Sequence, residues 1–227
     1  MQALLFDLDG TLMDTAPDMA AALNRLLARR NRPTLPLSRI RPHVSHGSIG
    51  MLRIGFGKGP EEEGFEELKE EFLADYAEAL CVQTQLFTGL ESVLGHCQDI
   101  GLPWGIVTNK PGWLTEPLLE QFALPYEPGC VVCGDTLEHR KPHPAPLLHA
   151  CRLLGVEPEH AVYIGDDERD MIAARDAGMR GVIALYGYVP ETMNPSDWPA
   201  VHSLNSPGDL LAWLNVAVKS RDYGARP

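Results

Sequence analysis

The feature that most constrains the fold is an alternation of short apolar segments with longer amphipathic segments. The apolar segments are rich in aliphatic residues and lack a polar alternation, which is typical of strands buried on both faces. Strands and helices in this rhythm predict an α/β fold with a parallel sheet and helical crossovers. The predicted strands are residues 3–6, 105–107, 130–132, 161–164 and 181–185, and the predicted helices are residues 90–100, 113–122, 144–154 and 169–177.

One interval interrupts this alternation. Between Ala16 and Gln85 the sequence shows helical patterns, among them residues 18–30 and 66–80, and no convincing strand. We therefore predict an all-helical domain over residues 16–85, inserted into an α/β core made of residues 1–15 and 86–227.

Composition narrows the classes of partner. The 227 residues carry 19 basic and 31 acidic side chains, a net charge of −12, which argues against nucleic-acid binding because that depends on lysine and arginine. No apolar run approaches the roughly 20 residues of a membrane span, and the first residues lack the basic start of a signal peptide. Five cysteines in a chain of this size fit a reducing compartment. We expect a cytoplasmic monomer or homodimer that binds neither nucleic acid nor membrane.

Two carboxylates directly follow the first predicted strand. Asp7 and Asp9 lie two residues apart, so in an extended chain they project to the same side. Gly10 permits a tight turn and the close backbone approach that an anion needs. A calcium-binding EF-hand loop fits poorly, because its required glycine and glutamate positions hold other residues here. A turn with two solvated acids is the remaining alternative.

Three further polar groups stand at predicted strand ends or helix starts. Because functional side chains gather beyond the carboxyl ends of parallel strands, we expect these groups to converge on Asp7. Taken singly, each fits a turn, a surface lysine or a helix N-cap, whereas their joint order is far more specific. The groups are Thr108 with Asn109, Lys141, and Asp166 with Asp167 and Asp170.

In this order the motifs resemble those of the haloacid dehalogenase-like hydrolase superfamily, and the resemblance covers nearly the whole chain. The first motif is DLDGT at residues 7–11, the second Thr108, the third Lys141, and the fourth residues 165–167 with Asp170. The flanking residues 15–18, 108–110 and 173–178 resemble the phosphoglycolate phosphatase-like branch. That branch implies a Rossmann-like three-layer core with a helical cap inserted after the first motif.

The resemblance implies a magnesium-dependent phosphatase that hydrolyses a small phosphomonoester through an aspartyl-phosphate. Asp7 would be the nucleophile and Asp9 the general acid and base. Thr108 would hold phosphoryl oxygens, and Lys141 would neutralise charge. A metal is also expected from charge alone, because one lysine faces several carboxylates and a substrate dianion.

Further site residues follow from the same resemblance. The Mg²⁺ ligands would be Asp7, the carbonyl oxygen of Asp9, and Asp166. Asp170 is expected to support these ligands, and Asp167 either to bind the metal through water or to support them as well. The expected phosphate or substrate contacts are Leu8, Gly10, Thr11 and Asn109, with His46 and Arg53 as candidates from the cap.

The segments around the rim resemble those of bacterial N-acetylmuramic acid 6-phosphate phosphatases. Tyr186, Tyr188 and Trp198 could stack on a sugar or N-acetyl face, or could pack the C-terminal loop onto the core. We expect N-acetylmuramic acid 6-phosphate as substrate, in cell-wall sugar recycling. The alternatives are 2-phosphoglycolate and, in another class, a phosphosugar mutase.

Overall fold

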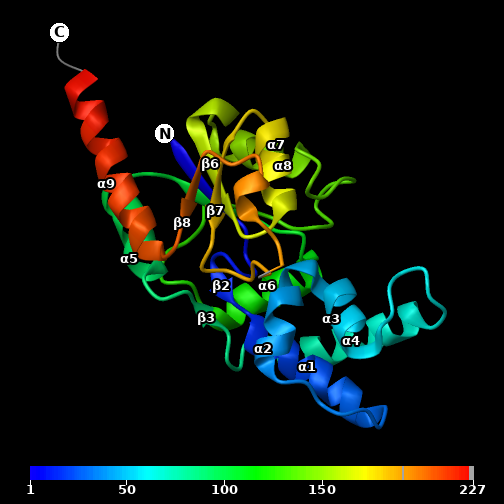
Figure 1. Ribbon diagram of the computed structural model, residues 1–227. Coiled ribbons are helices and arrows are strands. Elements are labelled where there is room, and N and C mark those ends of the chain that lie inside the picture. Colours follow the sequence, from blue (N-terminus) through cyan, green and yellow to red (C-terminus); the bar gives the residue numbers. More distant parts are fainter. Residues whose placement is uncertain (191, 225–227) are drawn as a thin grey trace.

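A six-stranded parallel sheet forms the centre of the computed structural model, which describes residues 1–190 and 192–224, with side chains described up to residue 215 (Figure 1). The strand order is β5-β4-β1-β6-β7-β8, so β1 lies between β4 and β6. In this register Leu5 of β1 is opposite Gly105 and Tyr163. The strands are β1 (Ala3–Phe6), β4 (Trp104–Val107), β5 (Cys130–Val132), β6 (Ala161–Gly165), β7 (Arg180–Ala184) and β8 (His202–Leu204).

The predicted α/β fold with a parallel sheet is confirmed, and each of the five predicted strands is present. The sequence analysis missed β8. Its residues His202 and Ser203 are exposed and only Leu204 is buried, so this edge strand has no apolar run to reveal it.

Helices cover both faces of the sheet and make it the middle of three layers. Side chains of β1 alternate between the two faces. Leu4 and Phe6 pack into the cluster that contains apolar residues of α5, α6 and α9, whereas Ala3 and Leu5 pack against α7 and α8. The helices are α5 (Leu90–Asp99), α6 (Gly112–Phe122), α7 (Ala145–Leu154), α8 (Glu168–Asp176) and α9 (Pro207–Gly224).

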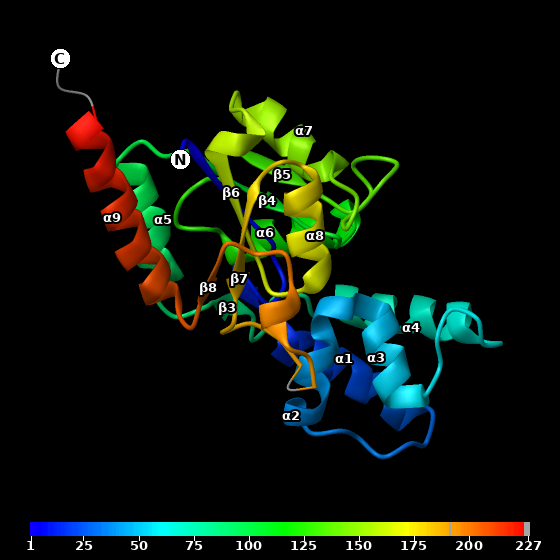
Figure 2. The same cartoon turned by 45° about the horizontal axis from the view of Figure 1, so that its top comes forward.

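A second group of helices lies beyond the edge at which β1 ends (Figures 1 and 2). We call residues 16–84 the helical segment. Its members share one buried cluster with the α5 side of the sheet. They are α1 (Ala16–Arg29), α2 (Leu37–Ile40), the 3₁₀-helix η1 (Arg41–His46), α3 (Gly47–Phe56) and α4 (Phe65–Ala77).

The chain enters and leaves the helical segment through two adjacent strands. β2 (Met13–Asp14) pairs antiparallel with β3 (Gln85–Leu86). The expected strandless interval therefore ends one residue too late, because Gln85 already belongs to β3. The buried Asp18 carboxylate ties the returning chain to α1, since it accepts N–H groups from residues 82–84 at 2.8–3.0 Å.

The described part of the chain contains no helix that is both long and apolar enough to cross a lipid bilayer.

Candidate active site

The first polar residues after three neighbouring strands meet at one edge of the sheet. The Asp7 N–H continues the sheet by donating to the Ile164 carbonyl at 2.9 Å, and the Thr108 N–H donates to the Val132 carbonyl at 2.9 Å. Because β1 lies between β4 and β6, Asp7 has Thr108 on one side and Asp166 on the other. This is the place in a doubly wound sheet where the chain changes direction, and ligands bind there.

Lys141 brings a buried positive charge to this edge. Its Nζ lies 3.0 Å from Asp7 Oδ1 and 2.7 Å from Asp170 Oδ1, and the residue is 2% exposed. It also donates to the Tyr163 hydroxyl at 2.6 Å, and that hydroxyl donates to the Val107 carbonyl at 2.8 Å. Tyr163 therefore orients Lys141, a contribution that the sequence analysis missed.

Asn109 holds the main chain of Lys141. The Asn109 Nδ2 donates to the Lys141 carbonyl at 2.8 Å, and the Lys141 N–H donates back to Asn109 Oδ1 at 3.0 Å. Both polar ends of the amide are thus engaged, which differs from the phosphate contact expected for this residue. Asn109, in the loop after β4, instead fixes the main chain of Lys141.

Three carboxylates form an acidic cluster beside Lys141. Oxygen atoms of Asp7, Asp166 and Asp170 lie within 4.8 Å of one another. Burial, aided by the charges of Asp170 and Asp9 and opposed by Lys141, raises the pKa of Asp7 to about 7. Burial and the charges of Asp7 and Asp170 raise the pKa of Asp166 to about 8. An all-oxygen cluster of desolvated acids suits a hard divalent cation, which would relieve their repulsion.

The two outer acids of the cluster have different partners. Asp166 accepts the Thr11 hydroxyl at 3.0 Å, the Ser45 hydroxyl at 2.8 Å and the Tyr188 N–H at 3.0 Å. Asp170 has one oxygen on Lys141 and the other on the Asp167 N–H at 3.1 Å. Asp170 therefore contacts both Lys141 and the main chain of Asp167.

The loop after β1 is shaped around these acids. Leu8 donates its N–H to Asp7 Oδ1 at 2.8 Å, and Gly10 donates its N–H to the Met13 carbonyl at 2.9 Å. Gly10 has a φ of +85°, and a Cβ there would lie 2.2 Å from Asp166 Oδ2, so only glycine fits. Of the expected phosphate contacts, Leu8 and Gly10 thus make hydrogen bonds within the loop in this structure, and Thr11 donates its hydroxyl to Asp166.

Asp9 is held on one oxygen only. Its Oδ1 accepts the Thr15 hydroxyl at 2.6 Å and the Lys110 ammonium at 2.8 Å. Its Oδ2 has no hydrogen bond among the described residues. Lys110 also reaches the Tyr76 hydroxyl of α4 at 2.9 Å. Lys110 had no role assigned from the sequence, because only folding brings it to Asp9.

Asp167 faces a different set of groups. It caps α8, and both its oxygens bind the Arg169 guanidinium at 2.7–2.8 Å. Burial opposes its ionisation, but the hydrogen bonds and charge of Arg169 outweigh burial and keep the pKa of Asp167 below its usual value. His46 Nε2 lies 4.0 Å away, and burial lowers the pKa of this histidine. Of the two roles expected for Asp167, support is the one that these contacts favour.

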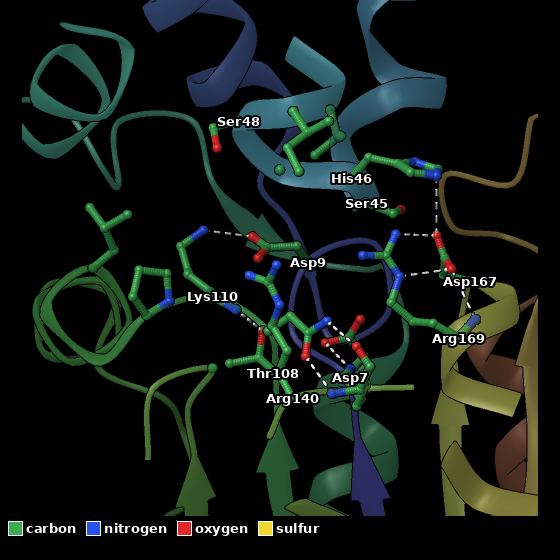
Figure 3. A pocket seen from close by; sticks show the side chains of 18 of the residues that line it. Asp7, Asp9, Ser45, His46, Ser48, Thr108, Lys110, Arg140, Asp167 and Arg169 are labelled. Atoms are coloured by element: carbon green, nitrogen blue, oxygen red, sulfur yellow. Dashed lines mark hydrogen bonds and ion pairs between the residues drawn. The ribbon is translucent and has the colours of Figure 1, made fainter. Parts of the chain in front are cut away.

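A cavity of about 700 Å³ lies between the sheet edge and the helical segment (Figure 3). Asp7, Asp9, Thr108, Asn109 and Lys141 line its floor. The opposite wall comes from the helical segment and is mostly apolar. Its members include Met19, Val44, Ser45, His46, Ile49, Phe72, Leu73 and Tyr76.

The two candidate residues from the helical segment have different positions. His46 lines the cavity. Arg53 is exposed and lies outside it, with its guanidinium 4.0 Å from Glu61. Arg140, which the sequence analysis did not single out, lines the cavity and has no ion pair within the described residues. Lys69, another cation at the cavity wall, forms an ion pair with Glu66.

The aromatic residues of the C-terminal loop do not line the cavity. Tyr188 is 2% exposed. Its hydroxyl donates to Asp14 Oδ1 and accepts the Ala16 N–H, each at 2.9 Å. Tyr186 donates its hydroxyl to the Thr11 carbonyl at 3.1 Å, and Trp198 is buried in a separate apolar cluster. Of the two alternatives that the sequence left open, these contacts support packing of the loop onto the core rather than stacking on a sugar. Phe72 and Tyr76 of α4 are the aromatic side chains at the cavity wall.

Comparison with known proteins agrees with this geometry. A sequence model described as "Haloacid dehalogenase-like hydrolase" matches residues 4–184. The chain is 45% identical to a phosphoglycolate phosphatase of Xanthomonas campestris pv. campestris (strain 8004), over 93% of this chain and 97% of that protein. It is 39% identical to an N-acetylmuramic acid 6-phosphate phosphatase of Pseudomonas putida, over 96% of this chain and 98% of that protein.

Solved structures show the same architecture. A crystal structure of a predicted phosphoglycolate phosphatase from Haemophilus somnus 129pt superposes with a TM-score of 0.81 at 27% identity, covering 94% of this chain and 98% of that one. The matched sequence and the shared fold together show that the chain belongs to the haloacid dehalogenase-like hydrolase family.

Proposed function

We propose that this hydrolase removes phosphate from a small phosphomonoester through an aspartyl-phosphate at Asp7, with Mg²⁺ as cofactor. The observation that carries the proposal is the position of Asp7, which faces a cavity beside both a buried lysine and an acidic cluster. The two relatives described above are both named as phosphatases of small phosphorylated acids.

The acidic cluster supports the choice of metal. Asp7 and Asp166 would hold Mg²⁺, with the carbonyl oxygen of Asp9 as the third protein ligand that the family resemblance implies. Asp170 keeps Lys141 in place. When bound, Mg²⁺ supplies the positive charge that lets a phosphate dianion approach these carboxylates.

The nucleophile is prepared by its contacts. Lys141 and the Leu8 N–H both bind Asp7 Oδ1. Asp7 Oδ2 has no hydrogen bond among the described residues. A carboxylate oxygen of Asp7 attacks phosphorus and breaks the bond to the leaving oxygen. Thr108, 3% exposed at the cavity floor, offers its hydroxyl to the phosphoryl oxygens.

Asp9 completes both halves of the reaction. Its protonated carboxyl donates a proton to the departing alkoxide, and the resulting carboxylate then takes a proton from the water that attacks phosphorus. That second step breaks the bond between phosphorus and Asp7, releases inorganic phosphate and restores the enzyme. Lys141 offsets negative charge throughout.

For the substrate we propose N-acetylmuramic acid 6-phosphate, with 2-phosphoglycolate as the alternative. A cavity of about 700 Å³ lies in the range of roughly 300–1,000 Å³ that holds drug-sized ligands, and a two-carbon acid would fill little of it. Both compounds carry a carboxylate besides the phosphate. Arg140, the cavity cation without an ion pair among the described residues, suits that carboxylate in either case.

A phosphate-release panel tests the proposal. It compares kcat/KM for N-acetylmuramic acid 6-phosphate, 2-phosphoglycolate and common sugar phosphates in the presence of Mg²⁺. A preference of about tenfold for phosphoglycolate, about 1.4 kcal/mol of transition-state discrimination, rejects the amino-sugar acid. Phosphate release that requires a bisphosphate activator, with transfer to a sugar hydroxyl, indicates the mutase alternative instead.

A further inference from the structure

A buried lysine connects the helical segment to Asp9. Lys110 is 8% exposed, and its Nζ lies 2.8 Å from Asp9 Oδ1 and 2.9 Å from the Tyr76 hydroxyl. The ammonium also lies over the Tyr76 ring, 4.6 Å from its centre. Figure 3 shows Lys110 and Asp9 facing each other across the cavity floor. The phosphatase mechanism proposed above gives Lys110 no step.

Burial of this lysine is costly unless the ammonium is paired, because removing a charge from water costs several kcal/mol. Burial opposes the charged form, but Asp9 and Tyr76 outweigh it and raise the pKa of Lys110 above its usual value. Burial raises the pKa of Tyr76 to about 12, so its hydroxyl stays neutral and accepts the hydrogen bond. Lys110 is therefore a fixed cation held from both sides.

Asp9 is held by the residue that precedes the helical segment and, through Lys110, by a residue of α4. Thr15 immediately precedes α1, and Tyr76 lies in the last turn of α4. Thr15 binds Asp9 Oδ1 directly at 2.6 Å, whereas Tyr76 acts on the same oxygen through Lys110. The carboxylate can turn about its side-chain bond only if it gives up one of these contacts. Oδ2 is consequently the oxygen free to face a leaving group.

We propose that Lys110 is a positioning residue that, anchored by Tyr76, holds Asp9 Oδ1 so that Oδ2 is aimed at the leaving oxygen. Through Tyr76 and Lys110, the position of α4 thereby sets the orientation of the Asp9 carboxyl during proton transfer. This inference rests on the proposed function, in which Asp9 is the general acid. It differs from a role for Lys110 in binding the substrate, because a substrate contact would act on every phosphomonoester regardless of its leaving group.

The experiment uses that difference. kcat/KM covers steps only up to transfer of phosphate to Asp7, and it is measured with Mg²⁺ for an alkyl phosphate and for p-nitrophenyl phosphate. An alkoxide needs a proton to leave, whereas p-nitrophenolate is a stable anion. General acid catalysis contributes about 10²–10⁴-fold. Lys110→Met should therefore lower kcat/KM for the alkyl phosphate at least about 30-fold more than for p-nitrophenyl phosphate.

Three companion variants sharpen the result. Asp9→Asn should show the same selective loss, and Lys110→Met added to it should cause no further selective loss. Tyr76→Phe, which removes only the anchoring oxygen, should give a smaller loss of the same kind, roughly three- to tenfold. Lys110→Arg should recover part of the alkyl phosphate activity. Lys69→Met removes another cavity-wall cation, one that pairs with Glu66, and controls for the change in charge.

Equal losses on the two substrates in Lys110→Met and Tyr76→Phe would overturn the inference and would place Lys110 on the substrate or in the folding core. A rise in KM for both substrates with unchanged kcat would overturn it as well. Wild-type protein that releases phosphate from neither substrate rejects the proposed function itself, which is a distinguishable result.

Discussion

Removing metal should make the stability of this protein fall as pH rises through neutrality. In the metal-free protein the pKa of Asp7 is raised to about 7 and that of Asp166 to about 8, chiefly by burial. Between the unfolded value of 3.8 and these folded values, the native state holds two protons that the unfolded chain releases. Stability from these groups is fully present below pH 3.8 and is lost as pH passes through 7 and 8.

The size of the effect follows from linkage. Each proton held only by the native state lowers the free energy of unfolding by about 1.4 kcal/mol per pH unit. Two such protons between pH 5 and pH 7 amount to about 5 kcal/mol. For a chain of this length that corresponds to a fall in Tm of roughly 10–20 °C.

Thermal unfolding of EDTA-treated protein at pH 5, 6 and 7 measures the slope. Asp166→Asn removes one of the two groups while keeping the same histidines, so its slope should be about half that of wild type. Mg²⁺ replaces the two protons, so its stabilising effect should be larger at pH 7 than at pH 5. A metal-free Tm that rises over this range, or equal slopes in wild type and Asp166→Asn, would show that Asp7 and Asp166 do not take up these protons on folding.

Three further outcomes are expected. EDTA should abolish phosphate release, Mg²⁺ should restore it and Ca²⁺ should substitute poorly, because Ca²⁺ takes more ligands and would hold Asp7 away from phosphorus; full turnover in EDTA after dialysis contradicts this. Asn109→Ala should lower kcat at least about tenfold and the free energy of unfolding by about 1–3 kcal/mol, because it removes both hydrogen bonds to the Lys141 main chain. Unchanged kinetics would show that Asn109 has no part in positioning Lys141. Arg140→Gln should lower kcat/KM for N-acetylmuramic acid 6-phosphate about tenfold or more relative to that for N-acetylglucosamine 6-phosphate, which lacks the carboxylate. Arg53→Gln should leave the ratio of the two kcat/KM values unchanged. Equal losses of kcat/KM on both substrates in Arg140→Gln would place Arg140 on the phosphate.

The sheet was predictable where strands are buried on both faces. β1 and β5 have the predicted bounds, because short apolar runs that end at turn or polar residues indicate such strands clearly. β8 and the pair β2–β3 were not predictable, since they are short and their pairing comes from distant parts of the chain. Tertiary pairing rather than local pattern makes them strands.

Within the site, the sequence predicted which residues follow the strand ends but not how they contact one another. Asp7, Thr108 and Asp166 converge because parallel strands end at one edge. The grip of Asn109 on Lys141, and that of Lys110 on Asp9, depend on loop conformations that no spacing reveals. The sequence left open whether Tyr188 stacks on a substrate or packs the C-terminal loop onto the core, because composition does not show which way a loop faces; the buried ring packs the loop.

The proposed mechanism depends on phosphorylation of Asp7, which can be tested by trapping the phosphorylated enzyme. Enzyme mixed with ³²P-labelled substrate and Mg²⁺ is quenched in acid within the first turnover, and the labelled peptide is sequenced. We expect an acid-stable, hydroxylamine-labile phosphate on the peptide that contains Asp7, and no label in Asp7→Asn, whose circular dichroism stays native. Label on another residue, or rapid turnover of Asp7→Asn, would rule out Asp7 as the nucleophile.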